Sequence, residues 1–318
     1  MAERQNEPMI TESCPYGSNA IARAAALIAA GQPVAVPTET VYGLAADARD
    51  SQAVARIYAA KGRPDFNPLI VHVPSAEMAE TLGRFGAVER ALAEAFWPGP
   101  LTLVVPRAPD CPVASIATAG LDTIALRVPE HRAMQALLAE TGAPLAAPSA
   151  NASGRVSPTR AEHVRASLDG RIALVIDDGA TRAGVESTIA RVVDGAVQIL
   201  RPGPVTASML GEASGLPVTG ASGAELVAPG MLASHYAPGK PVRLSATGFA
   251  VEEFGIGFGA IAGDYNLSAA GDLTEAAANL FDALHAAAAS VKAEIAVAAI
   301  PAEGLGAAIN DRLARAAV

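Results

Sequence analysis

Four clusters of polar and basic residues follow short apolar runs in this chain, and together they could bind an anionic ligand. The first is Pro37–Leu44 (PTETVYGL), which has two threonines and a glutamate where an apolar run ends. The second is Lys61–Pro68 (KGRPDFNP), in which Lys61 and Arg63 lie two residues apart. Lysine offers a mobile point charge and arginine a planar fork, so this pair could hold a polyphosphate. The alternative is a solvated helix end whose basic residues complement the helix dipole.

The third and fourth clusters come later in the chain. Pro148–Thr159 (PSANASGRVSPT) precedes a predicted helix and offers hydroxyls, an amide and backbone N–H groups, which favour an anion. Simple helix capping is the alternative. The fourth cluster joins Glu186–Thr188 to Leu200–Gly203, where Arg201 ends an apolar strand. A guanidinium there is costly unless it meets an anion, whether a ligand or a salt-bridge partner.

Familiar catalytic and nucleotide-binding motifs are absent from the sequence. It has no GxxxxGK[ST] loop, no HExxH and no GxSxG elbow. The five histidines are scattered singly, without a cysteine or second histidine at ligand spacing, so no protein metal site is expected. Gly255–Ala260 (GIGFGA) loosely matches half a dinucleotide fingerprint, but no clear strand precedes it. We interpret it as a glycine-rich turn or bulge.

The elements that must position these clusters mix strands and helices without a strict βαβ period, which predicts a sheet of mixed direction. Ligands collect at strand ends in such sheets, so the four clusters are expected to meet. The predicted helices are Ser18–Ala30, Ser51–Ala60, Ala76–Phe85, Val88–Phe96, His131–Glu140 and Gly306–Ala317. Two more are predicted from capping residues. Thr159 and Glu162, which have capping-box spacing, would open a helix that runs to Leu168, and Asp272 and Glu275 would cap one that runs to Val291. The predicted strands are Pro33–Pro37, Leu69–Val73, Leu101–Val105, Asp122–Val128, Pro144–Ala147, Leu174–Asp177, Thr188–Val193, Ala196–Leu200 and Glu294–Ile300.

The chain of 318 residues is long enough for about two domains. We predict a leader at residues 1–16, an α/β domain at 17–215, a linker at 216–240 and a small α/β domain at 241–318. The linker is rich in Gly, Ser, Pro and Ala and has no apolar periodicity.

Composition narrows the class of protein. Hydrophobic residues make up 51% and charged residues 17%, which excludes a disordered or coiled-coil chain. The net charge of -9 disfavours a non-specific duplex binder. No apolar run reaches the ~18 residues of a membrane span, so a soluble protein is expected, without membrane association. The first residues lack a secretory signal, and two cysteines cannot build a disulfide framework, so a cytoplasmic location is expected.

The ordered motifs PTETVYGL, KGRPDFNPLIVHV, APSANASG, ESTI and LRPG resemble the YrdC-like family of threonylcarbamoyl-AMP synthases. The resemblance covers about residues 17–205, and the segment 228–241 is similar to the interdomain linker of the longer, two-domain form. It implies a twisted mixed α/β sheet around a deep, positively lined cavity. It also implies a nucleotidyltransferase that makes L-threonylcarbamoyladenylate and pyrophosphate from L-threonine, bicarbonate or CO₂, and ATP.

Several further expectations follow from the resemblance. The product would serve threonylcarbamoyladenosine formation at position 37 of transfer RNA, carried out by other, downstream proteins. Threonine's amine would capture CO₂ as a carbamate, whose oxygen attacks the α-phosphorus of ATP. Such a reaction needs positioning and electrostatic stabilisation but no enzyme nucleophile. Mg²⁺ would accompany ATP, since it usually binds through substrate phosphates.

The resemblance also implies roles for individual residues. The catalytic set is Lys61, Arg63, Ser149 and Asn151. The ATP-binding set is Arg63, Asn67, Thr123, Ser149, Ser157, Arg201, His235 and Tyr236. The threonine-binding set is Thr40, His72, Arg127 (facing the carboxylate), Ala147 (through its backbone) and Ser187. Related linkers often carry more basic residues where this chain has Met231–Ser234.

Two other functions remain as alternatives. An RNA-binding module would need a broad basic and aromatic surface, whereas aromatic residues make up only 4% of this acidic chain. A carbamoyl-transfer domain of related fold, acting on carbamoyl phosphate, would usually bring zinc-finger and acylphosphatase-like segments. This chain has neither the cysteines nor the length for them.

Overall fold

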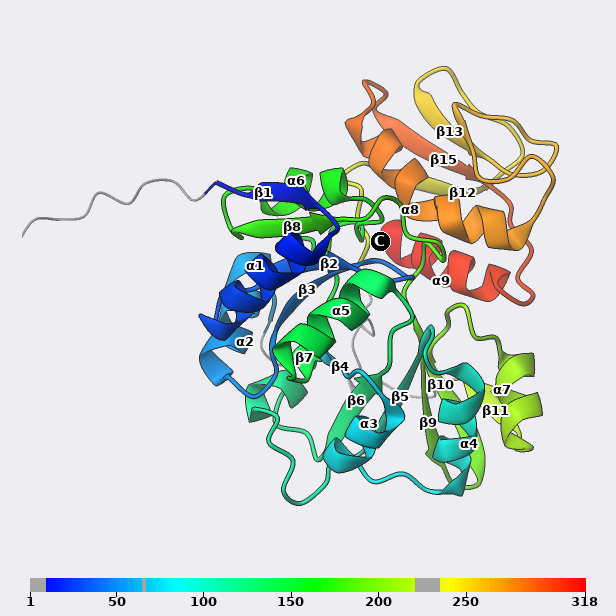
Figure 1. Cartoon of the computed structure of the whole chain (residues 1–318). Helices are drawn as coiled ribbons and strands as arrows, with labels where there is room; N and C mark the ends of the chain where they lie inside the picture. Colours follow the sequence, from blue (N-terminus) through cyan, green and yellow to red (C-terminus); the bar gives the residue numbers. More distant parts are fainter. Residues whose placement is uncertain (1–9, 65–66, 221–234) are drawn as a thin grey trace, which may run out of the picture.

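The computed structural model describes residues 10–64, 67–220 and 235–318. Within these ranges one large sheet holds, in spatial order, β1 (Glu12–Pro15), β8 (Leu174–Asp177), β2 (Val34–Pro37), β3 (Tyr42–Asp47), β7 (Leu145–Ala146), β4 (Ile70–His72), β6 (Thr123–Arg127), β5 (Leu101–Pro106), β9 (Thr188–Val193), β10 (Ala196–Arg201) and β11 (Val218–Gly220). Strands β2 and β3 pair antiparallel, whereas β4 and β6 pair parallel. The predicted mixed sheet is therefore confirmed (Figure 1).

Helices pack on both faces of this sheet. One face carries α1 (Ser18–Ala29) and α5 (Arg132–Thr141), and the other carries α2 (Ser51–Lys61), α3 (Ala76–Leu82), α4 (Ala87–Phe96), α6 (Ala161–Leu168), α7 (Ala207–Ser214) and the 3₁₀ helix η1 (Ser115–Thr118). Each face of the sheet has its own apolar core, because successive side chains of a strand point to opposite faces. In β2, Val34 and Val36 pack toward α1 and α5, whereas Ala35 packs toward the other face. None of the described helices is long and apolar enough to cross a bilayer.

Helices α1 and α5 cover only part of the width of their face of the large sheet. Their apolar cluster includes residues of β8, β2, β3 and β7, but none of β4 or β6. On β4 and β6, Val71 and Leu126 join the main core. The strand period of two therefore turns His72 and Arg127, which are register partners, to the opposite face. This uncovered part of the sheet is where polar side chains can surround a ligand.

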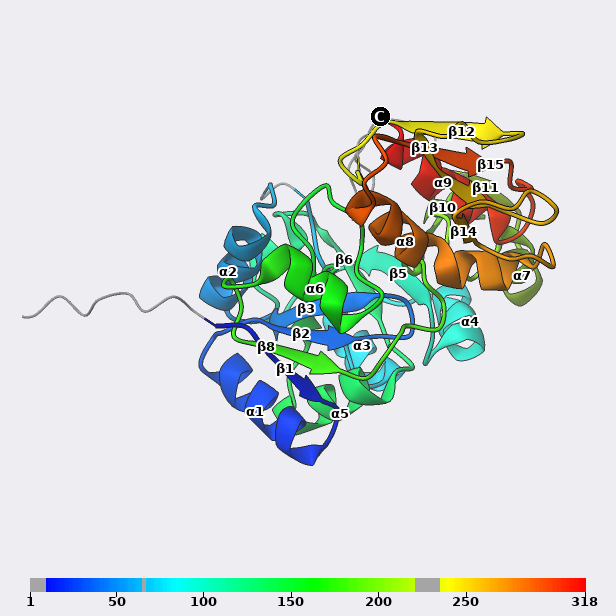
Figure 2. The same cartoon turned by 90° about the horizontal axis from the view of Figure 1, so that it is seen from above.

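The C-terminal unit is a small parallel sheet with two helices. Its strands lie in the order β12 (Val242–Ala246), β15 (Glu294–Ala298), β13 (Glu253–Gly257) and β14 (Tyr265–Asn266). Helices α8 (Leu273–Ala289) and α9 (Gly306–Ala316) lie between this sheet and the large one (Figures 1 and 2). Its apolar core continues into the first unit, which is the part of the chain that forms the large sheet, through Val41, Val156 and Val185.

Three strands of the large sheet, and β12, β13 and β14 of the small sheet, were not predicted from the sequence. Strand β1 pairs with β8, so residues 12–15 of the predicted leader belong to the sheet. Strand β11 lies within the predicted linker and pairs with β10. Strand β3 begins at Tyr42, inside the first polar cluster, so that this cluster contains the connection between β2 and β3, two strands of the same sheet. Residues 1–9 of the leader and 221–234 of the linker lie outside the described residues, and the domain boundaries stay predictions.

One local prediction was wrong and another holds only in part. The glycine-rich stretch is half strand and half turn, because Gly255 and Gly257 belong to β13 whereas Gly259 and Ala260 lie in a turn. A Cβ at Gly255 would lie 2.5 Å from the Phe249 ring, so this glycine permits close packing and does not mark a turn. The capping box at α6 does not form, because the Thr159 hydroxyl faces the ring of His163. The predicted cap of α8 is confirmed, with Asp272 Oδ1 accepting from the Glu275 N–H at 2.7 Å.

Candidate active site

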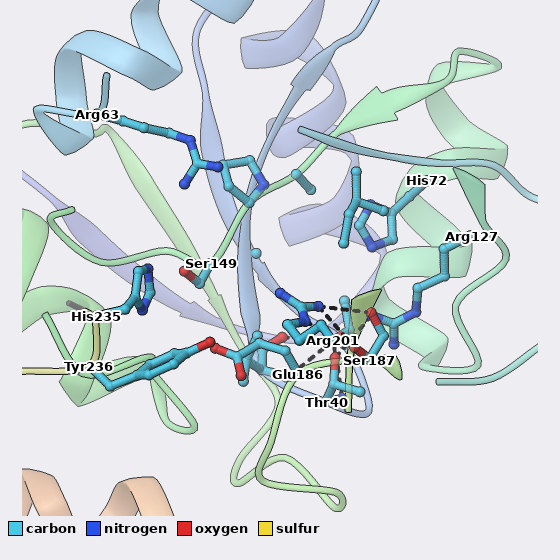
Figure 3. Close-up of a pocket in the computed structure, with 16 residues that line it drawn as sticks. Thr40, Arg63, His72, Arg127, Ser149, Glu186, Ser187, Arg201, His235 and Tyr236 are labelled. Atoms are coloured by element: carbon cyan, nitrogen blue, oxygen red, sulfur yellow. Dashed lines mark hydrogen bonds between the residues drawn. The ribbon is translucent and has the colours of Figure 1, made fainter. Parts of the chain in front are cut away.

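A cavity lies on the uncovered face of the large sheet, with an empty volume of about 560 Å³ including its mouth. The lining residues that the sequence predicts as site residues are Thr40, Arg63, His72, Arg127, Ala147, Ser149, Ser187, Arg201, His235 and Tyr236. The lining also includes Thr38, Val41, Gly43, Ile70, Pro148 and Glu186. Figure 3 shows Arg63, Ser149 and His235 on one side of the cavity and His72 with Arg127 on the other.

The end of α2 supplies two basic groups to this region. Gly62, with φ of 58°, ends the helix in the left-handed region and separates Lys61 from Arg63. Lys61 Nζ donates to the carbonyl oxygens of Ser149 and Asn151 at 2.6 and 2.5 Å. Arg63 donates to the carbonyl oxygens of residues 67 and 68 at 3.3 and 3.0 Å. Both cations are held by carbonyl oxygens, and the side chains at 65 and 66 in this loop lie outside the described residues.

Burial makes these two charges costly. It lowers the pKa of Lys61 well below its usual value, and the neighbouring Arg63 lowers it further. Burial also lowers the pKa of Arg63 to about 10, with the charge of Arg201 adding to the effect. Neither group has a carboxylate oxygen within 4.0 Å among the described residues. An anionic ligand would supply the missing counter-charge.

Arg201 reaches the cavity from the end of β10. A register shift between Ile199 and Arg201 marks an irregularity in the strand there. The guanidinium Nε and Nη2 donate to the Ser187 carbonyl oxygen at 3.1 and 3.0 Å, and Nη2 also donates to the Ser187 hydroxyl at 3.1 Å. Burial lowers the pKa of Arg201. The salt-bridge alternative is not found within the described residues, because no carboxylate lies within ion-pair distance of Arg201 there.

Arg127 differs from the other three cations because it has a buried acidic partner. Its Nη2 donates to Glu39 Oε1 at 2.6 Å, and both side chains are only 4% exposed. Nη1 donates to the Thr40 hydroxyl at 3.0 Å, and Nε donates to the Gly99 carbonyl oxygen at 3.1 Å. Burial would raise the pKa of Glu39, but the charge and the hydrogen bond of Arg127, together with hydrogen bonds from backbone N–H groups, outweigh burial and lower the pKa. One N–H of each terminal nitrogen remains for a ligand carboxylate.

His72 lies beside Arg127 and is buried; its ring nitrogens make no well-formed hydrogen bond within the described residues, only weak contacts with the backbone of Ile70 and Leu145. Burial and the charge of Arg127 lower the pKa of His72 to about 3, so its imidazole is neutral near pH 7. A histidine on a short strand is more often a satisfied core residue. A neutral imidazole that lies in a cavity wall without a well-formed hydrogen bond is instead available to a ligand.

The last residues of the predicted linker close another wall. The Ala237 N–H donates to the Gly154 carbonyl oxygen at 2.8 Å, which ties the linker to the third polar cluster. Tyr236 stacks on Phe281 of α8 with ring centroids 5.3 Å apart. Burial raises the pKa of Tyr236 to about 12 and lowers that of His235 to about 3. Residues Met231–Ser234 lie outside the described residues.

Some predicted site residues lie behind the lining or away from it: Lys61, Asn67, Thr123, Asn151 and Ser157. Lys61 and Asn151 brace the cavity wall from behind through backbone oxygens. Ser157 donates its hydroxyl proton to Glu186 Oε1 at 2.5 Å. Thr123 starts β6, at the opposite end of that strand from Arg127.

Two carboxylates near this cavity were not predicted as site residues. Glu39 and Glu186 each directly precede a predicted threonine-site residue, so their place in the motifs PTET and EST was the available signal. Arg127, Lys61, Arg63 and Arg201 outnumber them. The excess of positive charge fits a ligand with several negative charges. No group of three His, Cys, Asp or Glu in the described ranges could hold a metal ion.

Comparisons with known proteins find similar proteins for almost the full length of this chain. A family model for Sua5, YciO and YrdC proteins, described as "Telomere recombination", matches residues 26–203. A second, described as the C-terminal domain of threonylcarbamoyl-AMP synthase, matches residues 205–318. The threonylcarbamoyl-AMP synthase of Bacillus subtilis is 40% identical over 97% of this chain and 96% of its own length.

Two solved structures share the fold of this chain, one over almost its full length and one over its larger part. The crystal structure of Pyrococcus abyssi Sua5, described as complexed with L-threonine, has 37% identity and a TM-score of 0.87, covering 97% of both chains. Escherichia coli YciO, at 21% identity and a TM-score of 0.53, covers 61% of this chain and 95% of its own, and it shares the fold of the first unit.

Proposed function

Because this chain belongs to the threonylcarbamoyl-AMP synthase family in its two-domain Sua5 form, we propose that it makes L-threonylcarbamoyladenylate and pyrophosphate from L-threonine, bicarbonate or CO₂, and ATP. The observation that supports this most is the set of three basic residues formed by the buried Lys61 and Arg201 and the half-buried Arg63. Their donors contact carbonyl and hydroxyl oxygens, and no described carboxylate pairs with them. The triphosphate of ATP carries the charge that this set lacks.

The ATP end of the cavity is proposed to be the side of Arg63, Ser149 and His235. The guanidinium of Arg63 can meet phosphate oxygens as a fork, and Lys61 keeps the Ser149 loop in place from behind. Asn67, Thr123, Ser157, Arg201 and Tyr236 are the other residues assigned to ATP. Thr123 would contact a part of the nucleotide outside the cavity lining described above.

The threonine end is proposed to be the side of Arg127 and His72. The remaining N–H groups of Arg127 would receive the threonine carboxylate, and Glu39 holds the guanidinium in the required orientation. Thr40 and Ser187 offer hydroxyls, and Ala147 offers its backbone. Since His72 is neutral and makes no well-formed hydrogen bond within the described residues, it can accept a hydrogen bond from the substrate's amine or hydroxyl.

The reaction follows from placing the two substrates side by side. The neutral amine of threonine attacks CO₂ and loses a proton, which forms a carbamate. Where bicarbonate is the source, it takes up one proton and releases water to give the CO₂. A carbamate oxygen then attacks the α-phosphorus, and pyrophosphate leaves with the electron pair of the broken P–O bond. The residues orient the reactants and balance the charge that develops on the phosphates.

We also propose that Mg²⁺ enters with ATP. Glu186 is a carboxylate of the cavity wall, and its two oxygens already accept from Ser157 and Arg312. The phosphates and water would therefore supply the ligands of the ion, as is usual for Mg²⁺. When bound, the ion neutralises phosphate charge.

The product is proposed to serve threonylcarbamoyladenosine formation at position 37 of transfer RNA, carried out by separate proteins in the cytoplasm. The net charge of -9 supports a division of labour in which this chain does not itself hold the RNA strongly. Filter binding of transfer RNA across a salt series would contradict this point if it gave a steep slope.

A pyrophosphate-release assay tests the proposed activity. Purified protein is given ATP and Mg²⁺ with threonine and bicarbonate omitted in turn, and the adenylate is identified by mass spectrometry. Release that requires both omitted components, together with an adenylate of the expected mass, is the expected result. ATP binding without any adenylate from threonine would overturn the proposal, and turnover of carbamoyl phosphate would favour the carbamoyl-transfer alternative.

A further inference from the structure

Helix α9 carries an arginine on its buried face. Along this helix Ile309, Leu313 and Ala316 pack into the C-terminal core, and Arg312 lies on the same buried face with 0% exposure. A buried guanidinium is unfavourable unless anionic or polar groups compensate it. The partners of Arg312 therefore indicate why a charge stands where the helix pattern calls for an apolar residue.

Arg312 contacts two residues that line the cavity without lining it itself. Its Nε donates to Glu186 Oε2 at 2.9 Å, and its guanidinium carbon lies 5.5 Å from the centre of the Tyr236 ring. Its Nη1 donates to Asp311 at 2.7 Å. Glu186 and Tyr236 are both in the cavity wall (Figure 3). Arg312 thus links the C-terminal unit to the predicted active site.

The loop that carries Glu186 is held by the C-terminal unit at further points. A Cβ at Gly184 would lie 2.3 Å from the carbonyl oxygen of Ala277 in α8, so the loop backbone packs directly on that helix. Val185 belongs to the apolar core of the C-terminal unit. The next residue, Glu186, is held between Arg312 and the Ser157 hydroxyl, which donates to its other oxygen at 2.5 Å. Ser187, assigned to threonine, directly follows.

We propose that Arg312 is a positioning residue of the synthase: through Glu186 it fixes the 184–187 loop, so that the C-terminal unit completes the threonine end of the cavity. The proposal rests on the proposed function for its assay. Arg312 reaches the substrates only through Glu186 and Tyr236. Loss of its charge would release a buried carboxylate next to Arg201 and Ser187, and the cavity wall would rearrange.

The charge state of Glu186 offers a signature of this role. Burial would raise the pKa of Glu186, but Arg312 and Arg201 outweigh it and lower the pKa to about 2. The other titratable groups that interact with Glu186 are Lys61 of α2 and His235 and Tyr236 of the linker, and Asp311 of α9 pairs with Arg312 itself. Without Arg312, the carboxylate would lose its closest counter-charge and protonate at a higher pH.

A second interdomain ion pair offers a matched control. Arg160 Nε lies 2.9 Å from Asp282 Oδ1 of α8, with the two side chains 43% and 23% exposed. Neither residue lines the cavity. Replacing Arg160 by methionine therefore removes a contact between the same two units without releasing a cavity residue.

The test compares full-length wild type with Arg312→Met, Arg312→Lys, Arg160→Met and the double variant Arg312→Met/Glu186→Gln. Initial rates of adenylate formation are measured against threonine from pH 5.5 to 8.5, and thermal unfolding is measured for each protein. For Arg312→Met we expect kcat/KM for threonine to fall by roughly tenfold to a hundredfold. We also expect the pH–rate profile of Arg312→Met to have an acidic limb that the wild type lacks, so that the activity of this variant falls further as the pH is lowered. Arg160→Met should retain the wild-type rate and pH profile.

The double variant separates positioning from simple stability. Removing both charges should restore most of the unfolding temperature lost in Arg312→Met, since no unpaired buried charge remains. We expect its rate to stay low, because the carboxylate that shapes the wall is gone. Arg312→Lys, which keeps the charge but not the fork, should fall between wild type and Arg312→Met.

Three outcomes would overturn the inference: a wild-type rate and pH profile in Arg312→Met, full activity in the double variant, or an equal loss in Arg160→Met. If Arg312→Met does not fold, the double variant and Arg312→Lys decide the question by the same criteria. A wild-type protein that makes no adenylate would instead reject the proposed function, so the two failures are distinguishable.

Discussion

Lowering the pH from 7.5 to 5.5 should reduce the free energy of unfolding by about 4 kcal/mol. Three buried histidines, His72, His163 and His235, have pKa values lowered to about 3 in the folded protein, in each case mainly by burial. In the unfolded chain the same side chains titrate near their ordinary value of about 6.5. Between these values the unfolded state binds protons that the folded state cannot, so acid favours unfolding.

The magnitude comes from the size of that gap. At pH 5.5, one unit below the unfolded pKa, proton binding stabilises the unfolded state by about 1.4 kcal/mol for each histidine, and at pH 7.5 by less than about 0.1 kcal/mol. The lowered pKa values of His131 and His285 act in the same direction. The carboxylates do not obscure the effect. Glu186, whose pKa is lowered to about 2, contributes stability that is present above about pH 4.5 and is lost only below it.

Urea unfolding at the two pH values measures this difference. The only tryptophan, Trp97, reports on the large sheet through its fluorescence, and circular dichroism reports on both units. His163→Asn should reduce the pH dependence by about a third, because it removes one of the three groups. Equal free energies of unfolding at pH 7.5 and 5.5 would refute the reasoning, as would an unchanged pH dependence in His163→Asn.

Three further predictions concern the cavity. Lys61→Ala and Arg63→Ala should each weaken ATP binding by roughly tenfold to a hundredfold, with circular dichroism unchanged. Calorimetry measures this, and unchanged affinity in both would move the phosphate site elsewhere. Arg127→Met should raise the KM for threonine at least about tenfold, with little change in the KM for ATP. Glu39→Gln keeps the guanidinium of Arg127 and should raise the KM for threonine less. Equal effects on the KM values of both substrates would contradict the assignment. A chain ending after Gly220 should fold but make adenylate slowly, because α8 and α9 no longer hold the 184–187 loop. Full activity in the truncated protein would exclude this role.

The sequence alone was sufficient for the features that depend on neighbouring residues. The polar clusters were recognisable because each follows an apolar run within a few residues. The same holds for the cap at Asp272, whose partner is three residues away. The mixed direction of the sheet also followed from the irregular order of strands and helices.

Features that join distant parts of the chain were decided by the tertiary structure. Arg127 and Glu39 are 88 residues apart, and they meet because β6 and the β2–β3 connection lie against the same cavity. Glu186 and Arg312 are 126 residues apart and belong to different units. A side chain's sequence neighbours determine its local backbone, but the counter-charge of a buried group is set by packing and strand register. The sequence therefore indicated which residues are candidates for binding a triphosphate and an amino acid, and only the fold decided that Glu39 holds Arg127 and that Arg312 holds Glu186.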